Sequence, residues 1–257
     1  MVSVTSSLLT PCGRTRPRTR AGAVPVLGET APTRILDWGH PRVSALVGRV
    51  TSRNPEGPLD LLRIAHGVIA RTVRPVYSVK DLRPVSETLR RGRGSCSQRL
   101  AVLEAVARAS GVPTRVRGLL VDGAMWYPRF PRLRLLVPDR VVLAWPEFRL
   151  ADGWLQASEL FGGLDDLSRA PGGGFANDGG ETLFEALSRT AVDWDGVTSP
   201  PGACSVCDLS ARVLTDLGRH RSRDALFAEH GQTLCWAART LAEPLLGRWS
   251  AGADLPR

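Results

Sequence analysis

The segment covering residues 95–111 constrains the fold most, because it predicts a helix with sharp boundaries at both ends. It reads SCSQRLAVLEAVARASG and follows the glycine-rich GRGS at 92–95. Its apolar side chains recur at helical spacing, at Leu100, Leu103, Val106 and Ala107. Gly111 is the expected C-terminal cap, and Pro113 prevents the helix from continuing. We therefore expect a strongly amphipathic helix that carries Cys96 in its first turn.

The flanking segments predict a mixture of helices and strands. A helix is expected over 58–74 and a short helical turn over 86–89, while strands are expected over 114–121, 141–150 and 153–157. Beyond a glycine-rich stretch, further helices are expected at 181–192, 208–218, 222–230 and 232–246. A helix followed by strands that are joined by short turns is typical of an α+β fold.

The chain of 257 residues divides by composition into four parts. Hydrophobic residues make up 43% and charged residues 23%, as in an ordinary globular protein. Residues 1–34 are basic and lack periodicity, so we expect a disordered tail. We then expect a core domain over 35–162, a glycine-rich linker over 163–180 and a helical extension over 181–257.

The net charge is +9, but almost all of the positive charge comes from arginine, because Lys80 is the only lysine. These arginines are scattered along the chain, which disfavours a nucleic-acid-binding surface. No apolar run reaches the roughly 18 residues that cross a bilayer, so no membrane span is expected. Five irregularly spaced cysteines argue against a disulfide scaffold and favour free thiols in a reducing, cytoplasmic compartment.

Cys96 is the candidate nucleophile. The first N–H groups of a helix lack internal partners and carry partial positive charge, which lowers the pKa of a thiol placed there. The same N–H groups stabilise an oxyanion that forms when sulfur attacks a carbonyl carbon. The alternative is that Cys96 is a small buried hydrophobic residue, which is the commonest role of a lone cysteine.

The residues around Cys96 resemble the core of the transglutaminase-like superfamily, which has a papain-like fold. The resemblance rests on PVSETLRRGRGSCSQRLAVLEAVARASGVPTRVRGL at 84–119, on LAWPEF at 143–148 and on DGW at 152–154, and it covers about residues 59–162. It implies a helix bearing Cys96 that packs on a small antiparallel sheet. It also implies thiol-dependent acyl transfer, or amide or peptide hydrolysis, on a peptide or protein carboxamide or acyl substrate.

Two positions that complete the family's triad are altered here. The resemblance places Leu143 where the family has a basic histidine, and Ser158 where it has the aspartate that orients this histidine. Leucine cannot accept a proton. The residues that remain to substitute for the base are Glu159, Glu147 and His66, although mid-helix spacing also fits His66 as a packing residue.

Two functions from different classes therefore remain open: a thiol acyltransferase or hydrolase with a rebuilt site, and a catalytically inactive scaffold or binding module of the same fold. In either case the aromatic residues Trp126, Tyr127, Phe130 and Trp145 are candidates to line a cleft, and core packing is the alternative for each. No cofactor is expected, because no phosphate-binding glycine loop and no HExxH motif occurs. The sequence sets no oligomeric state.

The third hypothesis is a zinc-stabilised interaction protein. CSVC supplies Cys204 and Cys207, and His220, His230 and Cys235 follow. Zinc fingers space their two histidines about three to five residues apart, whereas nine residues separate His220 from His230. The spacing therefore favours incidental thiols, and Cys204, Cys207 and His220 remain as the metal candidates.

Overall fold

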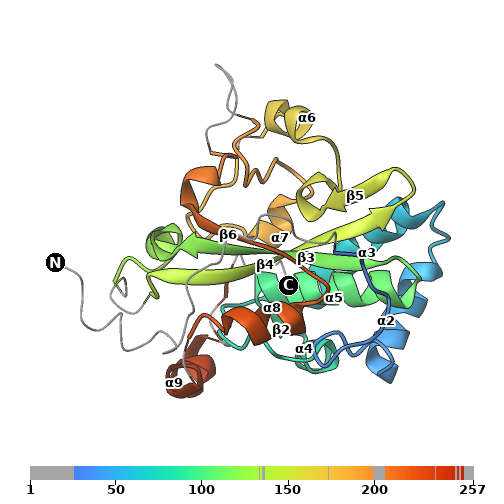
Figure 1. Ribbon diagram of the computed structural model, residues 1–257, viewed down its shortest axis with the longest axis horizontal. Coiled ribbons are helices and arrows are strands. Elements are labelled where there is room, and N and C mark those ends of the chain that lie inside the picture. The colour runs from blue at the N-terminus through green and yellow to red at the C-terminus, as the bar shows by residue number, and fades with distance from the viewer. Residues whose placement is uncertain are drawn as a thin grey trace.

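The structure is a computed structural model that describes residues 26–132, 134, 137–172, 174–198, 206–234, 236–246, 248, 250 and 251. In this part of the chain a four-stranded antiparallel sheet with the order β5-β4-β3-β6 forms the centre of the molecule (Figure 1). Its strands are β3 (Thr114–Asp122), β4 (Arg140–Leu150), β5 (Gly153–Gln156) and β6 (Val213–His220). Two short strands, β1 (Arg74–Pro75) and β2 (Arg93–Gly94), pair in parallel beside it.

Helices surround this sheet. The first group is α2 (Pro41–Thr51), α3 (Pro58–Thr72), α4 (Val85–Arg91) and α5 (Cys96–Ala109), with the 3-10 turn η1 (Gly123–Arg129) after β3. After β5 follow η3 (Ala157–Glu159), α6 (Leu164–Arg169), α7 (Leu183–Ala186), η4 (Ser210–Arg212), α8 (Arg223–His230) and α9 (Trp236–Leu246). In Figure 1, α5 and α8 lie below the sheet and α6 lies above it. The α+β class and the antiparallel sheet are confirmed.

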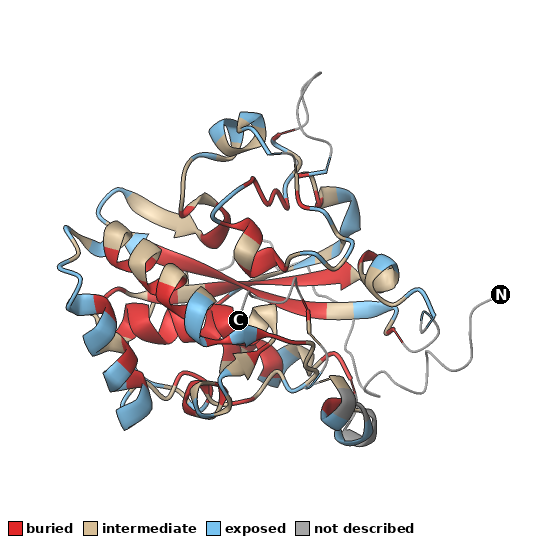
Figure 2. Ribbon diagram, turned by 180° about the vertical axis from the view of Figure 1, so that it is seen from behind, coloured by how far each residue is buried: buried red, intermediate tan, exposed pale blue. Residues whose placement is uncertain are grey.

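The predicted elements around Cys96 are confirmed within a few residues, but α5 differs from its predicted character. Every residue from Gln98 to Arg108 is buried, so α5 has no exposed face (Figure 2). The expectation of an amphipathic helix is therefore wrong. Its polar side chains instead find partners from other segments, as burial of a charged group requires. Glu104, for example, is paired with Arg223 at the start of α8.

The C-terminal part also differs from the sequence-based expectation. The helix expected over 208–218 is wrong, because strand β6 occupies 213–220 and pairs antiparallel with β3. Pairing with an existing strand edge overrides the local helical pattern here. The helix expected over 181–192 is reduced to α7, and α9 begins at Trp236. The sheet thus takes one of its four strands from the predicted extension.

The N-terminal segment meets the same sheet. Residues 1–25 lie outside the described part of the chain, but Val26 and the residues after it are placed. Glu29 and Thr114 exchange backbone hydrogen bonds of 3.0 Å in both directions. The final residues of the predicted tail therefore pair with the start of β3, whereas the predicted division into domains stays a prediction.

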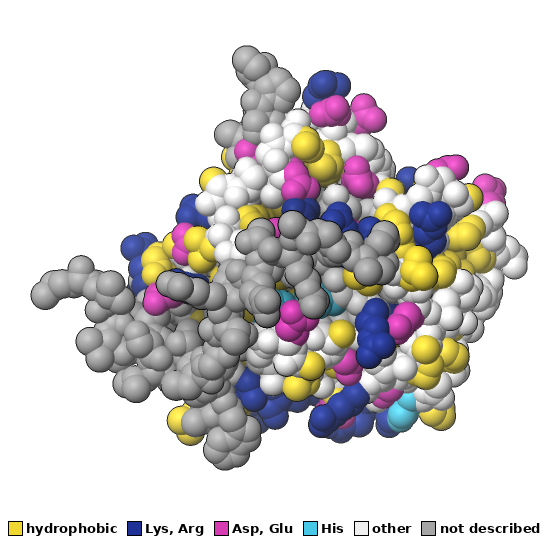
Figure 3. Space-filling view, viewed as in Figure 1, with side chains coloured by type: hydrophobic (Ala, Val, Ile, Leu, Met, Phe, Trp, Pro, Cys, Tyr) yellow, Lys and Arg dark blue, Asp and Glu magenta, His cyan; other side chains and the backbone are white. Residues whose placement is uncertain are grey.

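Two surface features bear on the expected partners. On the face shown in Figure 3, Lys and Arg side chains are interspersed with Asp and Glu and do not gather in one basic patch. Within the described residues, none of the helices combines the length and apolar character needed to cross a membrane. The expected absence of nucleic-acid binding and the expected compartment stay predictions.

Arg108 joins three segments through hydrogen bonds. Its guanidinium donates to Thr114 Oγ1 (2.7 Å) and to the carbonyls of Thr114 (3.3 Å), Ala31 (2.8 Å) and Arg221 (2.8 Å). Arg108 is 1% exposed and its partner Thr114 is fully buried, whereas Ala31 and Arg221 lie at the surface. Arg108 therefore holds the N-terminal segment, β3 and the entry to α8 around the end of α5.

We predict that Arg108→Met lowers the free energy of unfolding by about 3 kcal/mol, because it removes four hydrogen bonds, two of them to the buried Thr114, and with them the link between three segments. The control is Arg49→Met, which replaces an exposed arginine in the last turn of α2 and should change stability by less than about 0.5 kcal/mol. Urea unfolding followed by circular dichroism measures both. Equal effects of the two variants would contradict the role assigned to Arg108.

A second prediction concerns Asp81, whose Oδ2 accepts a hydrogen bond from the Thr233 N–H at 3.4 Å. Burial raises the pKa of this carboxyl from 3.8 to about 7. The folded state therefore holds a proton that the unfolded state releases, so stability falls as pH rises from about 4 to about 7. Asp81→Asn should flatten this part of the stability profile, whereas Asp139→Asn, at an exposed site, should leave it unchanged.

Candidate functional site

Cys96 is the first residue of α5, as predicted. A reciprocal cap fixes this helix end: Ser95 Oγ accepts from the Gln98 N–H at 3.3 Å, and Gln98 Oε1 accepts from the Ser95 N–H at 3.1 Å. Such a capping box stabilises the start of a helix. The glycine-rich GRGS therefore leads directly into a well-fixed first turn that carries the thiol.

The pKa of the Cys96 thiol is raised, whereas the sequence predicted that it would be lowered. Burial, together with the carboxylate of Glu185, raises the pKa of Cys96 to about 12, although the residue as a whole is only half-buried. Arg99, the backbone of Phe184 and Arg223 lower the pKa, but their combined effect is smaller. The predicted lowering of the Cys96 pKa is therefore wrong, because desolvation of a thiolate costs more than the helix end and nearby arginines return.

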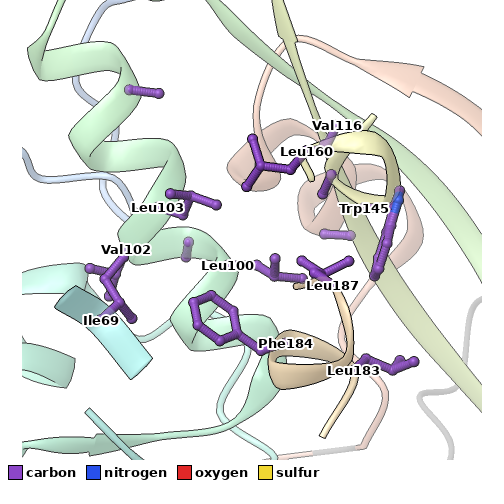
Figure 4. Packing of buried hydrophobic residues seen from close by; sticks show 14 of the residues in the cluster. Ile69, Leu100, Val102, Leu103, Val116, Trp145, Leu160, Leu183, Phe184 and Leu187 are labelled. Atoms are coloured by element: carbon purple, nitrogen blue, oxygen red, sulfur yellow. The ribbon is translucent and has the colours of Figure 1, made fainter. Parts of the chain in front are cut away.

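The short helix α7 packs against this end of α5. Its residue Phe184 is fully buried, stacks on the His66 ring at 4.3 Å and lies under the Arg99 guanidinium at 4.3 Å. Figure 4 shows Phe184 directed towards α5 and Leu187 lying between Leu100 and Trp145. These side chains belong to the continuous hydrophobic core. The end of α5 next to Cys96 is thus covered by side chains of α7.

Arg99 holds α7 in place and is itself incompletely paired. Its Nη1 forms an ion pair with Glu185 of α7. The side chain is fully buried, yet its Nε and Nη2 have no hydrogen-bond partner within the described part of the chain. A buried guanidinium with two unpaired nitrogens is costly and marks a place where an anion would be stabilised.

The two altered triad positions are buried. Leu143 lies on β4 opposite Leu119 of β3 and is 6% exposed, so it extends the core. Ser158 lies in η3 and is also buried. Neither side chain can serve as a base near neutral pH. Trp145, two residues from Leu143 on the same strand, is buried and packs edge-on against Trp194 at 5.4 Å.

Two of the three possible substitutes for the base, Glu147 and His66, make polar contacts with other groups. Glu147 is buried and paired with Arg115 and Arg219, so its oxygens are occupied. His66 Nε2 lies 2.6 Å from the Phe184 carbonyl, and burial keeps the pKa of this histidine below its usual value. His66 and Cys96 therefore both face the Phe184 backbone. Glu159 lies in η3, and its proposed role as a base stays a prediction.

Three of the aromatic residues expected to line a cleft make contacts within the fold, and their role in lining a cleft stays a prediction. Trp126 packs against the core, while Tyr127 and Phe130 contact Arg134 and Tyr77 respectively. A cavity of about 380 Å³ lies elsewhere and is lined by Met125, Phe175, Asn177, Val206, Asp208, Leu209, Ala211 and Arg212. None of these residues belongs to α5, α7 or β4.

The expected zinc ligands are not brought together in the described part of the chain. Cys204 lies outside the described residues, and Cys207 is buried with its sulfur 3.1 Å from Thr190 Oγ1. His220 instead approaches His230, whose spacing from His220 does not fit a zinc finger, and Glu229, which the cysteine and histidine pattern does not include. The feature of the sequence that could have indicated this group is the short turn at 221–222, which folds α8 back beside the end of β6.

A cysteine at the start of a buried helix, packed beside an antiparallel sheet, agrees with the comparison to known families. Residues 50–158 match the model of the transglutaminase-like superfamily. The chain contains a transglutaminase-like domain. This domain runs from the end of α2 to η3 and includes Cys96, Leu143 and Ser158. No curated protein and no solved structure matches the chain.

We predict that Cys96 reacts slowly with iodoacetamide at pH 7.5. A pKa of about 12 in place of 9.0 lowers the thiolate fraction about a thousandfold, and α7 restricts access. Peptide mass spectrometry should show labelling of Cys96 at least about tenfold slower than in the unfolded protein. Labelling as fast as that of a free thiol would contradict this result.

A further prediction tests whether α7 limits the access of a reagent to Cys96. Phe184→Ala should speed the labelling of Cys96, because it removes the ring that packs at the start of α5. Phe175→Ala removes an equally large buried side chain beside the separate cavity and should leave the Cys96 rate unchanged. If both variants accelerate labelling equally, general loosening and not α7 controls access.

Proposed function

We propose that the transglutaminase-like domain of this chain is a non-catalytic scaffold or binding module. The observation that carries this proposal is the burial of the thiol, which raises the pKa of Cys96 to about 12 at the position of the family's nucleophile. A thiol in this state supplies almost no thiolate at neutral pH.

Two further observations support the same proposal. Leu143 extends the core where the family has its base, and loss of a general base typically lowers the rate about a hundredfold to ten-thousandfold. Phe184, whose backbone hydrogen-bonds to the Cys96 thiol, is itself fully buried and packs against the Arg99 guanidinium of α5. The base and the thiolate are thus both reduced, and the side chains at these positions contribute to the core.

A second candidate function is thiol-dependent acyl transfer that requires displacement of α7. It is favoured by Arg99, whose buried Nε and Nη2 have no partner among the described residues and would stabilise an oxyanion beside Cys96. In this reaction the thiolate attacks a peptide or protein carboxamide, ammonia leaves, and a thioester forms. An amine or water then takes the acyl group and releases the thiol.

We predict that one assay separates the two functions. The full chain is incubated with a blocked Gln-Gly dipeptide and hydroxylamine, and hydroxamate formation is measured for the wild type, Cys96→Ser, Phe184→Ala and the Phe184→Ala/Cys96→Ser double variant. For a scaffold, all four proteins should give the same background rate.

Hydroxamate formation by the wild type above the Cys96→Ser background would overturn the scaffold proposal. Activity that appears only in Phe184→Ala and disappears in the double variant would identify α7 as a removable cover and support the second candidate. Circular dichroism of each variant ensures that a lost signal does not arise from unfolding.

A further inference from the structure

Three side chains with metal-binding atoms converge at the junction of β6 and α8, away from Cys96. His220 is the last residue of β6, and Glu229 and His230 are the last two residues of α8. One ligand atom from each lies within 4.8 Å of the other two. His220 Nδ1 is 3.6 Å from one carboxylate oxygen of Glu229, and His230 Nε2 is 3.8 Å from the other.

The hydrogen bond made by His220 determines which of its nitrogens faces the carboxylate. Nε2 lies 3.2 Å from the Leu217 carbonyl, and a carbonyl only accepts, so Nε2 carries a proton. In the neutral ring, Nδ1 is then unprotonated and directs its lone pair towards Glu229. Metal-binding histidines commonly have this arrangement, in which the second ring nitrogen donates to a backbone carbonyl.

An imidazole lone pair and a carboxylate oxygen that face each other repel unless a positive charge lies between them. A proton on either ring would also bridge its own pair, because each ring faces a different carboxylate oxygen. A divalent cation, however, is bound by both imidazoles and the carboxylate at once, and the two ring centroids lie only 5.3 Å apart. In tetrahedral zinc sites the ligand atoms lie about 3.3 Å apart, as follows from metal–ligand bonds of about 2.0–2.1 Å.

The surrounding charges permit a cation at this place. Arg219 directs its guanidinium to Glu147, so its charge is paired with a carboxylate outside the cluster. Arg223 is likewise paired with Glu104. The cluster also lies at the C-terminal end of α8, where the helix dipole favours positive charge.

We propose that His220, Glu229 and His230 form a binding site for a divalent transition-metal ion of the zinc class. Two imidazoles and one carboxylate are a known three-ligand set for zinc that leaves a fourth position for water. Glu229 is 65% exposed on its side chain, so this fourth position faces solvent. The ion would hold the end of α8 against the end of β6, and no cysteine would be among its ligands.

Cobalt substitutes for zinc and reports its ligands by absorption, so the test is a titration of the metal-free full chain with Co²⁺ and then Zn²⁺. We expect one Co²⁺ per chain, with visible bands of a low-coordinate ion and no near-ultraviolet band from thiolate-to-metal charge transfer. Glu229→Gln and His230→Gln should each weaken binding about tenfold or more.

The matched control is His40→Asn, which removes a distant histidine and keeps an N-cap residue at the start of α2. It should bind as the wild type does. A thiolate band would assign the ion to the cysteines, and binding unchanged in Glu229→Gln and His230→Gln would place it elsewhere. Either result, or no binding at micromolar metal, overturns the proposal. Because both variants alter residues at the partly exposed end of α8, failure to fold is not expected to mask the outcome.

Discussion

The structure depends on burying α5 on all sides. A helix in this position needs a partner for each polar side chain, because an unpaired charge in the interior costs several kcal/mol. Those partners come from distant parts of the chain: Glu185 for Arg99, Arg223 for Glu104, and the carbonyls of Ala31 and Arg221 for Arg108. The C-terminal segment is therefore part of the core that surrounds the helix bearing Cys96.

This requirement also explains the state of the thiol. The ion pair between Arg99 and Glu185 brings α7 against the start of α5, and with it the Phe184 ring and the Glu185 carboxylate. Both changes disfavour a thiolate, one by removing water and the other by adding negative charge. A helix N-terminus activates a thiol only where solvent or a cation remains, so position at the first residue of α5 does not by itself make a nucleophile.

Local signals in the sequence predicted the elements near Cys96 well. Gly111 and Pro113 set the end of α5, and the alternation from Thr114 onwards predicted β3. The sequence could not show that Arg99, Glu104 and Arg108 are buried, because their partners lie far away along the chain. For the same reason β6 was missed: residues 213–220 are a strand only because β3 offers a free edge.

The segment from β6 to α8 connects the sheet to the site. β6 pairs with β3, and three residues after its end Arg223 donates to Ser97 Oγ at 3.0 Å and to the Ala144 carbonyl at 3.2 Å. Arg223 thereby joins α5 to β4, the two elements that carry the nucleophile and base positions of the family. It is also one of the groups that lower the pKa of Cys96. A contact at one end of α8 thus influences the thiol through the placement of a single buried guanidinium.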